Sequence, residues 1–227
     1  MENELYMVHI AAESWLPGTY ARALKLADLL RFPRDDYAAL PPPEQDRLRQ
    51  SQIELNEVVR ILGYHERHAL LMKSDKVLGW VLHSELAIDP ELKAFEPIIS
   101  LKLSSADFFA SWKDTSYVWG GITHSGIDCS GLTQRYFRDV LDQVIPKNTF
   151  DQRRSGTSKA LADISEHDLI FCTRIGGRGT HHVGIYVAGD VWHAHRERGV
   201  IRQSLTEFLR DYQVLEVVSL SSEMQQN

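Results

Sequence analysis

Cysteine is scarce in this sequence, and the features of a secretory leader are lacking. Only two cysteines, Cys129 and Cys172, occur among 227 residues. The first residues carry acidic side chains and no basic segment of the kind that opens a signal peptide. Two distant cysteines in such a chain are better interpreted as reduced thiols than as a disulfide. We therefore expect a cytoplasmic protein.

Positive charge and long apolar runs are also lacking. The formal net charge is −6, whereas binding along a phosphate backbone requires a basic surface, so nucleic acid is excluded as a partner. No apolar run approaches the roughly 18 residues that span a bilayer, which predicts a protein without a membrane partner. The remaining composition, 43% hydrophobic and 25% charged, is typical of a globular fold.

A change of composition near residues 89–97 divides the sequence. The segment DPELKAFEP holds two prolines and several charges, as an interdomain linker does. A chain of this length accommodates two modest domains. We predict one domain over residues 1–92 and a second over residues 93–227.

The first domain is expected to be a small antiparallel β-barrel with a helical insertion. Short apolar runs separated by turns over residues 52–86 indicate strands. Three are expected, at Val58–Leu62, Leu70–Met72 and Trp80–Leu82. Residues 21–31 carry apolar side chains at helical spacing, and an acid- and arginine-rich stretch follows the prolines at 41–43, so these segments predict the insertion.

The second domain shows helices first and strands afterwards. Residues 104–112 predict a helix with a serine cap, and residues 128–144 predict a second helix. Its apolar face would carry Leu132, Tyr136, Val140 and Val144. Strand-like segments follow at residues 168–173, 182–187, 190–195 and 213–218. This order predicts an α+β fold.

Cys129 stands in the segment SGIDCSGL, at the start of the second predicted helix. The free N–H groups and the positive dipole end of a helix start favour a thiolate. The small side chains of Ser130 and Gly131 would leave the sulfur accessible. The position also suits a small buried residue, so this segment alone leaves the role open. Cys172 lies in the apolar run LIFCT and is expected in the core.

Two histidine pairs supply candidate partners for the cysteine. A thiolate nucleophile needs an imidazole to exchange protons, and that imidazole needs an orienting group. His181 and His182 open one strand-like segment, and His193 and His195 lie on the next, so antiparallel pairing would bring them together. Strand geometry does not choose within either pair. For His181 and His195 we expect hydrogen-bonded surface positions.

Zinc is the rival interpretation of the same residues. The two cysteines and four histidines offer enough ligands, but the paired spacings of zinc sites are absent. We therefore expect no metal.

Four residue blocks surround the candidates. They read SYVWGGITHSGIDCSGLTQRYF, IPKNTFDQRRSG, HDLIF and HHVGIYVAGDVWHAHRERGV, and they cover nearly all of residues 116–200. In this order they resemble the papain-like catalytic domain of NlpC-type cell-wall peptidases, in which helices pack on an antiparallel sheet. The upstream block around GWV resembles the bacterial SH3-like domain of the two-domain members of that family.

The resemblance implies a catalytic trio. Cys129, in the family's Asp-Cys-Ser-Gly segment, would be the nucleophile. His182, just before Val-Gly-Ile-Tyr, would be the general base and acid, and His193 would be the orienting third residue.

The resemblance also implies residues that bind the substrate. Tyr117 matches a tyrosine that lines the site and helps to hold the oxyanion. Asp128 and Ser130 occupy positions that bind the substrate's N-terminal amine and γ-glutamyl region in members acting on free stem peptides. By their chemistry alone, Asp128 also suits a helix cap and Tyr117 a buried ring. The sequence departs from the family at Lys147, where arginine is usual, and at Phe150, where a small residue is common.

We therefore expect a cysteine endopeptidase that needs no cofactor. Its substrate would be a peptidoglycan stem peptide of the L-Ala-γ-D-Glu-diamino acid type, cleaved at the γ-D-glutamyl-L-diamino acid bond. Muropeptide fragments with a free amine, as in cell-wall recycling, are expected, with the barrel helping to close one end of the groove. Two alternatives stay open: an inactive wall-binding module, and an amidase or acyltransferase that uses the same trio.

Overall fold

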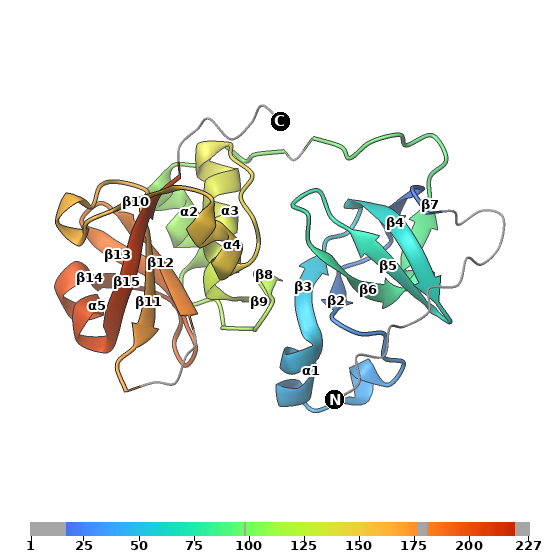
Figure 1. The fold of residues 1–227 in the computed structure, drawn as a ribbon, viewed down its shortest axis with the longest axis horizontal. Helices are drawn as coiled ribbons and strands as arrows, with labels where there is room; N and C mark the ends of the chain where they lie inside the picture. Colours follow the sequence, from blue (N-terminus) through green and yellow to red (C-terminus); the bar gives the residue numbers. More distant parts are fainter. Residues whose placement is uncertain (1–16, 98, 177–180, 221–227) are drawn as a thin grey trace. The chain divides into compact units, whose positions relative to one another are not determined.

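A computed structural model describes residues 17–97, 99–176 and 181–220 of the chain (Figure 1). The chain divides into two compact units, residues 1–97 and 98–227. The expected boundary after residue 92 lies within a segment that packs on the first unit. There the ring of Phe95 meets Tyr20 edge-on at 5.3 Å, and Glu96 accepts a hydrogen bond of 2.9 Å from Arg22.

The first unit is built on one antiparallel sheet. Its elements are β1 (Tyr20–Ala23), β2 (Ala27–Leu30), η1 (Tyr37–Ala39), α1 (Pro42–Leu48), β3 (Arg49–Ile53), β4 (Val58–His65), β5 (His68–Met72), β6 (Leu78–Leu82), η2 (His83–Glu85) and β7 (Leu86–Ile88). Within the described residues the seven strands lie in the order β3-β2-β6-β5-β4-β1-β7. The strands expected within residues 52–86 are confirmed as β4, β5 and β6.

The expected helix over residues 21–31 is wrong, because this segment forms β1 and β2. Ala21 and Ala23 are fully buried while Arg22 between them is only half-buried, which is the period of two that a strand produces. The helical segment begins instead at Pro42. Proline suits the first turn of a helix, where its missing N–H has no partner to lose.

The second unit has helices first and a sheet afterwards. Its elements are α2 (Ser105–Trp112), β8 (Ile122–Thr123), β9 (Gly126–Ile127), α3 (Cys129–Leu141), α4 (Thr149–Arg154), β10 (Thr157–Lys159), η3 (Leu161–Asp163), β11 (Leu169–Arg174), β12 (His181–Val187), β13 (Asp190–His195), β14 (Gly199–Ser204), α5 (Leu205–Asp211) and β15 (Tyr212–Ser219). In the described part, six strands form an antiparallel sheet in the order β10-β15-β11-β12-β13-β14. The expected α+β class is confirmed.

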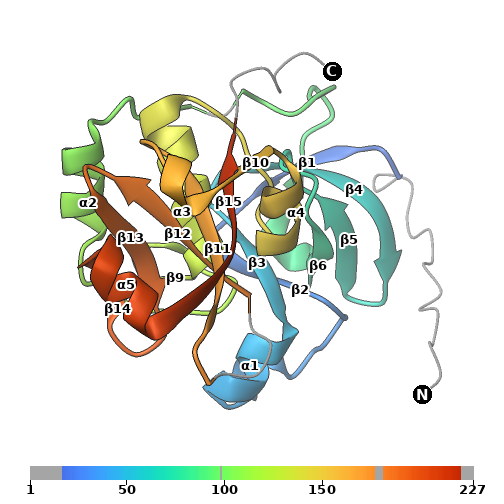
Figure 2. The same cartoon turned by 60° about the vertical axis from the view of Figure 1, so that its left-hand side comes forward.

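Helices cover both faces of this sheet, as Figures 1 and 2 show. On one face α2 and α3 pack on the sheet through Phe108, Phe109 and Tyr136. On the other face α5 packs through Phe208. The two apolar layers together fix the sheet between the cysteine-bearing helix and the helix that follows β14.

The ends of the helices follow their capping residues. Ser104 caps α2 by accepting a hydrogen bond of 3.1 Å from the Asp107 N–H, as expected. Helix α3 ends at Leu141, earlier than expected, because Asp142 adopts a left-handed conformation with φ of 56°. Val144 is consequently exposed and does not extend the apolar face.

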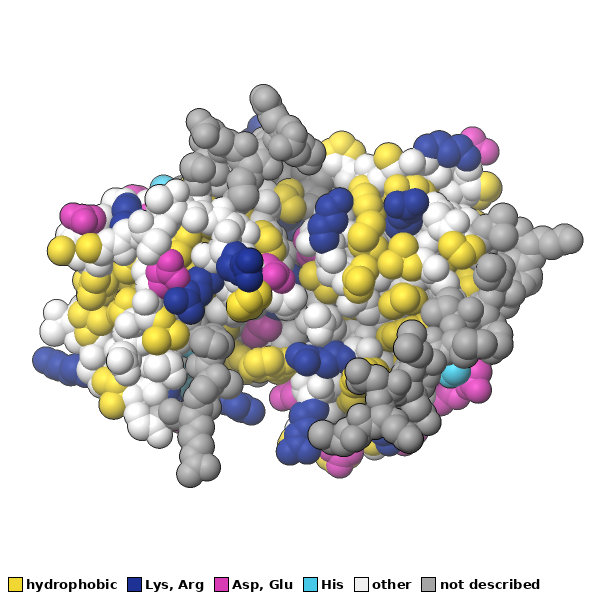
Figure 3. Space-filling model, in the orientation of Figure 1, with side chains coloured by type: hydrophobic (Ala, Val, Ile, Leu, Met, Phe, Trp, Pro, Cys, Tyr) yellow, Lys and Arg dark blue, Asp and Glu magenta, His cyan; other side chains and the backbone are white. Residues whose placement is uncertain are grey.

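Large hydrophobic side chains are also exposed on both units. On the face seen in Figure 3 they lie among charged and polar side chains. Taken over all faces, the exposed large hydrophobic side chains include Leu24, Leu26, Phe32, Leu55 and Leu78 in the first unit and Leu101, Val144, Phe150, Ile175 and Leu215 in the second. Among the described residues, no helix combines the length and the apolar character that crossing a membrane requires.

Two phenylalanines of the second unit allow a matched test of its core. Phe108 is fully buried, whereas Phe150 is 63% exposed. We expect Phe108→Ala to lower the free energy of unfolding by about 3–5 kcal/mol, since it leaves a cavity. Phe150→Ala is expected to change it by about 0.5 kcal/mol or less. Urea denaturation followed by fluorescence measures both, and equal effects would contradict the described core.

Candidate active site

A glycine-rich loop brings the start of α3 close to the chain before it. Gly120 has φ of 73°, a conformation that other residues rarely adopt. A β-carbon on Gly131 would collide with the carbonyl oxygen of Gly121. The glycines around Cys129 in the sequence are therefore needed for this close packing.

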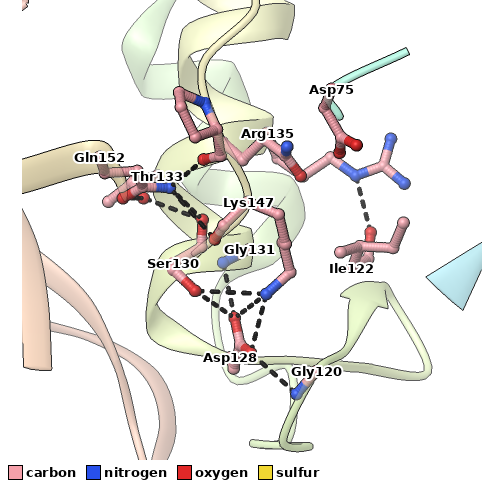
Figure 4. Close-up of polar contacts among 12 residues, drawn as sticks. Asp75, Gly120, Ile122, Asp128, Ser130, Gly131, Thr133, Arg135, Lys147 and Gln152 are labelled. Carbon is pink, nitrogen blue, oxygen red and sulfur yellow. Dashed lines mark hydrogen bonds and ion pairs between the residues drawn. The ribbon is translucent and has the colours of Figure 1, made fainter. Parts of the chain in front are cut away.

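Asp128 caps α3 and is the centre of a buried polar cluster (Figure 4). Its carboxylate accepts hydrogen bonds from the backbone N–H of Gly131 at 2.6 Å and of Gly120 at 2.8 Å. The Lys147 ammonium, itself buried, bonds to both carboxylate oxygens at 2.8 and 2.9 Å. The Ser130 hydroxyl adds a fourth donor at 3.2 Å. These donors use roughly all the lone-pair positions that a carboxylate offers.

Gln152 extends this cluster beneath α3. Its amide nitrogen donates to the carbonyl oxygens of Ser130 and Pro146, both at 2.9 Å, and its amide oxygen accepts from Thr133 at 2.8 Å. Gln152 is fully buried. The hydroxyl of Ser130 also accepts from Lys147 at 3.2 Å, so Ser130 points into the cluster.

The two histidines of the expected trio are hydrogen-bonded to each other. His182 Nε2 lies 2.9 Å from His193 Nδ1. His193 Nε2 lies 2.7 Å from Gln203 Oε1, and Gln203 Nε2 donates to Asp211 at 3.0 Å. His193 is fully buried. The structure thus chooses His193, and not His195, as the partner of His182.

Aromatic rings hold both imidazoles in place. Tyr212 stacks on His182 with 4.9 Å between ring centroids and 16° between planes. Phe208 in turn stacks on Tyr212 at 4.6 Å, and it meets His193 edge-on at 5.2 Å. This packing restricts rotation of the rings.

The thiol of Cys129 lies against the strand that carries His182. The backbone N–H of Val183, the residue after His182, lies close enough to the sulfur to lower the pKa of the thiol. Cys129 is 6% exposed and belongs to the buried cluster that includes Val183 of β12, so the expected accessible sulfur is not found.

The expectation of a resting thiolate is also wrong. Burial, and after it the negative charge of Asp128, raise the pKa of the Cys129 thiol to about 11. The N–H groups of Val183 and Ser130 and the Lys147 charge lower the pKa, but they do not outweigh burial. The thiol is therefore protonated near neutral pH.

The imidazoles of His182 and His193 are also uncharged near neutral pH. Burial holds the pKa of His182 well below its ordinary value, and the charges of His193 and His195 lower it further. Burial lowers the pKa of His193 to about 4, although the hydrogen bond to Gln203 opposes this. At neutral pH the site therefore holds a neutral thiol and neutral imidazoles.

The other sequence candidates have varied positions. Tyr117 is half-buried and packs against the core cluster that includes Cys129. Cys172 is fully buried, as expected, and both cysteines are free thiols. His195 is buried, contrary to the surface position expected for it, because β14 pairs along that part of β13. The side chain of His181 lies outside the described residues.

Sequence reasoning did not find Gln152, Gln203, Asp211 or Tyr212. A signal existed for α5, because Ser204 and Glu207 form a capping box, which a sequence can show. No such signal marks Gln203, whose place beside His193 depends on strand register. Within the described residues, no cluster of three histidine, cysteine or acidic side chains is arranged to hold a metal ion.

Comparison with known proteins finds a family and several relatives that match the part of the chain that holds this site. The model of the NlpC/P60 family matches residues 114–218. The chain is 37% identical over 110 residues to the Escherichia coli protein named murein DD-endopeptidase MepS/murein LD-carboxypeptidase, a match over 48% of this chain and 57% of that protein. The chain thus spans little more than half the length of that relative.

Two further relatives extend the comparison. A probable endopeptidase NlpC homolog of Haemophilus influenzae is 34% identical over 148 residues, which are 62% of this chain and 78% of that protein. A Bacillus subtilis protein named γ-D-glutamyl-L-lysine dipeptidyl-peptidase is 40% identical over 74 residues, which are 32% of this chain and 25% of that protein.

The pKa of Cys129 predicts how its alkylation depends on pH. Because the pKa is raised to about 11, the reactive thiolate fraction should grow about tenfold per pH unit from pH 6 to 10. The iodoacetamide rate constant should follow it, with Cys129→Ala as the unlabelled control. A plateau in that rate between pH 5 and 8 would instead reveal a thiolate–imidazolium pair at rest.

The buried ion pair predicts an unequal response to loss of two lysines. Lys147→Met leaves the Asp128 carboxylate buried without its cation, so we expect a loss of about 3–5 kcal/mol in the free energy of unfolding. The same change at exposed Lys113 should cost about 0.5 kcal/mol or less. Denaturant titration compares the two, and a small effect at Lys147 would refute the described pairing.

Proposed function

The chain belongs to the NlpC/P60 family, and we propose that it is a cysteine endopeptidase acting on peptidoglycan stem peptides. Relatives named as murein endopeptidases support peptidoglycan hydrolysis as the activity. The observation that carries the proposal is the hydrogen bond between the rings of His182 and His193, together with the burial of Cys129 in one cluster with Val183, the residue after His182. A papain-like hydrolase needs these three groups together.

The proposed reaction begins from neutral groups. As the Cys129 sulfur attacks the carbonyl carbon of the scissile amide, its proton passes to the ring of His182. His182 then gives this proton to the leaving amine, the C–N bond breaks, and a thioester remains. Water attacks the thioester while His182 accepts a proton from it. The C–S bond breaks, and the proton returns to the sulfur.

Groups around the sulfur support the charges of this reaction. The N-terminus of α3 and the Lys147 ammonium stabilise the anionic sulfur and the oxyanion that forms beside it. We propose that the Tyr117 hydroxyl helps to hold that oxyanion. Besides the substrate and the attacking water, the proposed reaction uses only side chains and backbone groups of the chain.

We propose the γ-D-glutamyl-L-diamino acid bond as the one that is cleaved. The Bacillus subtilis relative is named for a γ-D-glutamyl-L-lysine substrate, which supports this choice. Binding of a free L-alanine amine by Asp128 and Ser130, as the sequence led us to expect, would require a change in the contacts of Asp128. Asp128 already pairs with Lys147 and two backbone N–H groups, so an incoming ammonium would have to displace a buried cation. We therefore propose cleavage that does not require a free amine.

The first unit completes the proposal. We propose that its antiparallel sheet is a bacterial SH3-like domain, and its strands β4, β5 and β6, which form the block that carries this resemblance, support the assignment. The cytoplasmic location stays a prediction.

Peptide hydrolysis tests the proposed activity. Wild-type protein should release the diamino acid portion from L-Ala-γ-D-Glu-L-Lys and from its meso-diaminopimelate counterpart, as followed by mass spectrometry. Cys129→Ala should abolish release, whereas Cys172→Ala, which removes the other buried thiol, should retain it. Absence of cleavage by the wild type would favour an inactive binding module.

The state of the L-alanine amine provides a second test. If Lys147 stays paired with Asp128 when the substrate binds, the free and the N-acetylated peptides should give kcat/KM values within about threefold of each other. A lost ion pair to a buried carboxylate would cost more, about 2–5 kcal/mol. A preference of a hundredfold or more for the free amine would show that the substrate replaces Lys147.

A further inference from the structure

The two histidines belong to a longer chain of hydrogen bonds. It runs from His182 to His193 over 2.9 Å, on to Gln203 over 2.7 Å, and then to Asp211 over 3.0 Å. Each ring nitrogen and each amide atom in it is either a donor or an acceptor. The direction of every bond therefore depends on the next one.

Asp211 fixes the donor and the acceptor of the hydrogen bond at one end of this series. A carboxylate only accepts hydrogen bonds, so the Gln203 amide must turn its NH₂ group toward Asp211. Its oxygen then faces His193. Turning the amide over would set its oxygen against the carboxylate oxygen, which is repulsive. Gln203 is 8% exposed, so little water reaches it to relieve that repulsion.

We propose that Gln203 and Asp211 are positioning residues that set the tautomers of His182 and His193. The Gln203 oxygen accepts a hydrogen bond, so Nε2 of His193 carries the proton. Nδ1 of His193 is then an acceptor, so Nε2 of His182 carries the proton that joins the rings. The lone pair of His182 is left on Nδ1, the ring nitrogen not used by His193.

This tautomer is the one that the reaction needs. A lone pair on Nδ1 of His182 can take the proton of Cys129, whereas an N–H there cannot. When His182 becomes an imidazolium, its Nε2–H still donates to His193. The negative charge of Asp211 lies at the other end of this series of hydrogen bonds. The catalytic consequence rests on the proposed peptidase function, but the tautomers do not.

Nitrogen NMR of the unaltered protein tests the tautomers directly. In protein labelled with ¹⁵N at histidine, long-range ¹H–¹⁵N spectra at pH 7 should show protonated Nε2 and unprotonated Nδ1 for both His182 and His193. Protonation of His193 on Nδ1 would overturn the proposal. This result does not depend on whether the protein cleaves any peptide.

Substitution of Gln203 tests the effect on catalysis. Gln203→Met removes the acceptor, so His193 should show a mixture of tautomers and kcat should fall about 10- to 100-fold, as for orienting partners of metal-bound histidines. KM should change by about twofold or less. Gln203→Glu combined with Asp211→Asn still presents an oxygen to His193 and lets the Asn amide donate to the other carboxylate oxygen, so this pair should restore both the tautomer and most of kcat. Wild-type kcat and tautomers in Gln203→Met would overturn the proposal.

Two more variants, at Gln213 and Asp211, extend this test. Gln213→Met makes the same change at an exposed position of β15 and should leave kcat and tautomers unchanged. Asp211 is exposed, so Asp211→Ala should fold even if Gln203→Met does not. It should lower kcat by about 2- to 12-fold, the range of one net hydrogen bond, and mix the tautomers of His193. If wild type cleaves no stem peptide, the peptidase proposal fails while the NMR result still decides the tautomers.

Discussion

One buried carboxylate organises the cysteine side of the site. Asp128 joins the glycine loop, the first turn of α3 and the segment that carries Lys147. A charge taken out of water is tolerated only with such partners, so these three segments must fold against one another together. The position of Cys129, the next residue, follows from that requirement.

In the proposed reaction, the same carboxylate opposes the negative charge that the Cys129 sulfur develops. Burial, and after it the charge of Asp128, raise the pKa of Cys129, and burial lowers the pKa of His182. The thiol and the two imidazoles are therefore uncharged at rest, and in the proposed reaction a thiolate–imidazolium pair forms only as the proton moves. Cations and anions are arranged for that moment: Lys147 lies on the sulfur side, and Asp211 lies beyond the histidines. Such fixed charges need no rearrangement when the reaction begins.

The parts of the structure that depend on a short local pattern could be predicted from the sequence. The cysteine at the start of α3 and the strands β11, β12 and β13 could be predicted from local pattern, and so could the serine cap of α2. Residues 21–31 could not, because alanines at positions 21 and 23 fit a helix and a strand alike until burial decides. The thiol looked accessible from its small neighbours, yet Cys129 is buried in a cluster with Val183 of distant β12. Long-range partners such as Lys147 follow only from the fold.

Register explains why the histidine side was harder to predict than the cysteine side. On β13 and β14, His193 is paired with Ile201 and Val191 with Gln203, so Gln203 reaches His193 as a diagonal neighbour on the same face. A slip of one residue would turn His193 to the opposite face and break its bonds to both His182 and Gln203. The capping box that starts α5 directly after β14 helps to hold this register, since it fixes where the strand ends. The alignment of the imidazoles thus depends on α5 and β14, which carry no motif of the catalytic chemistry.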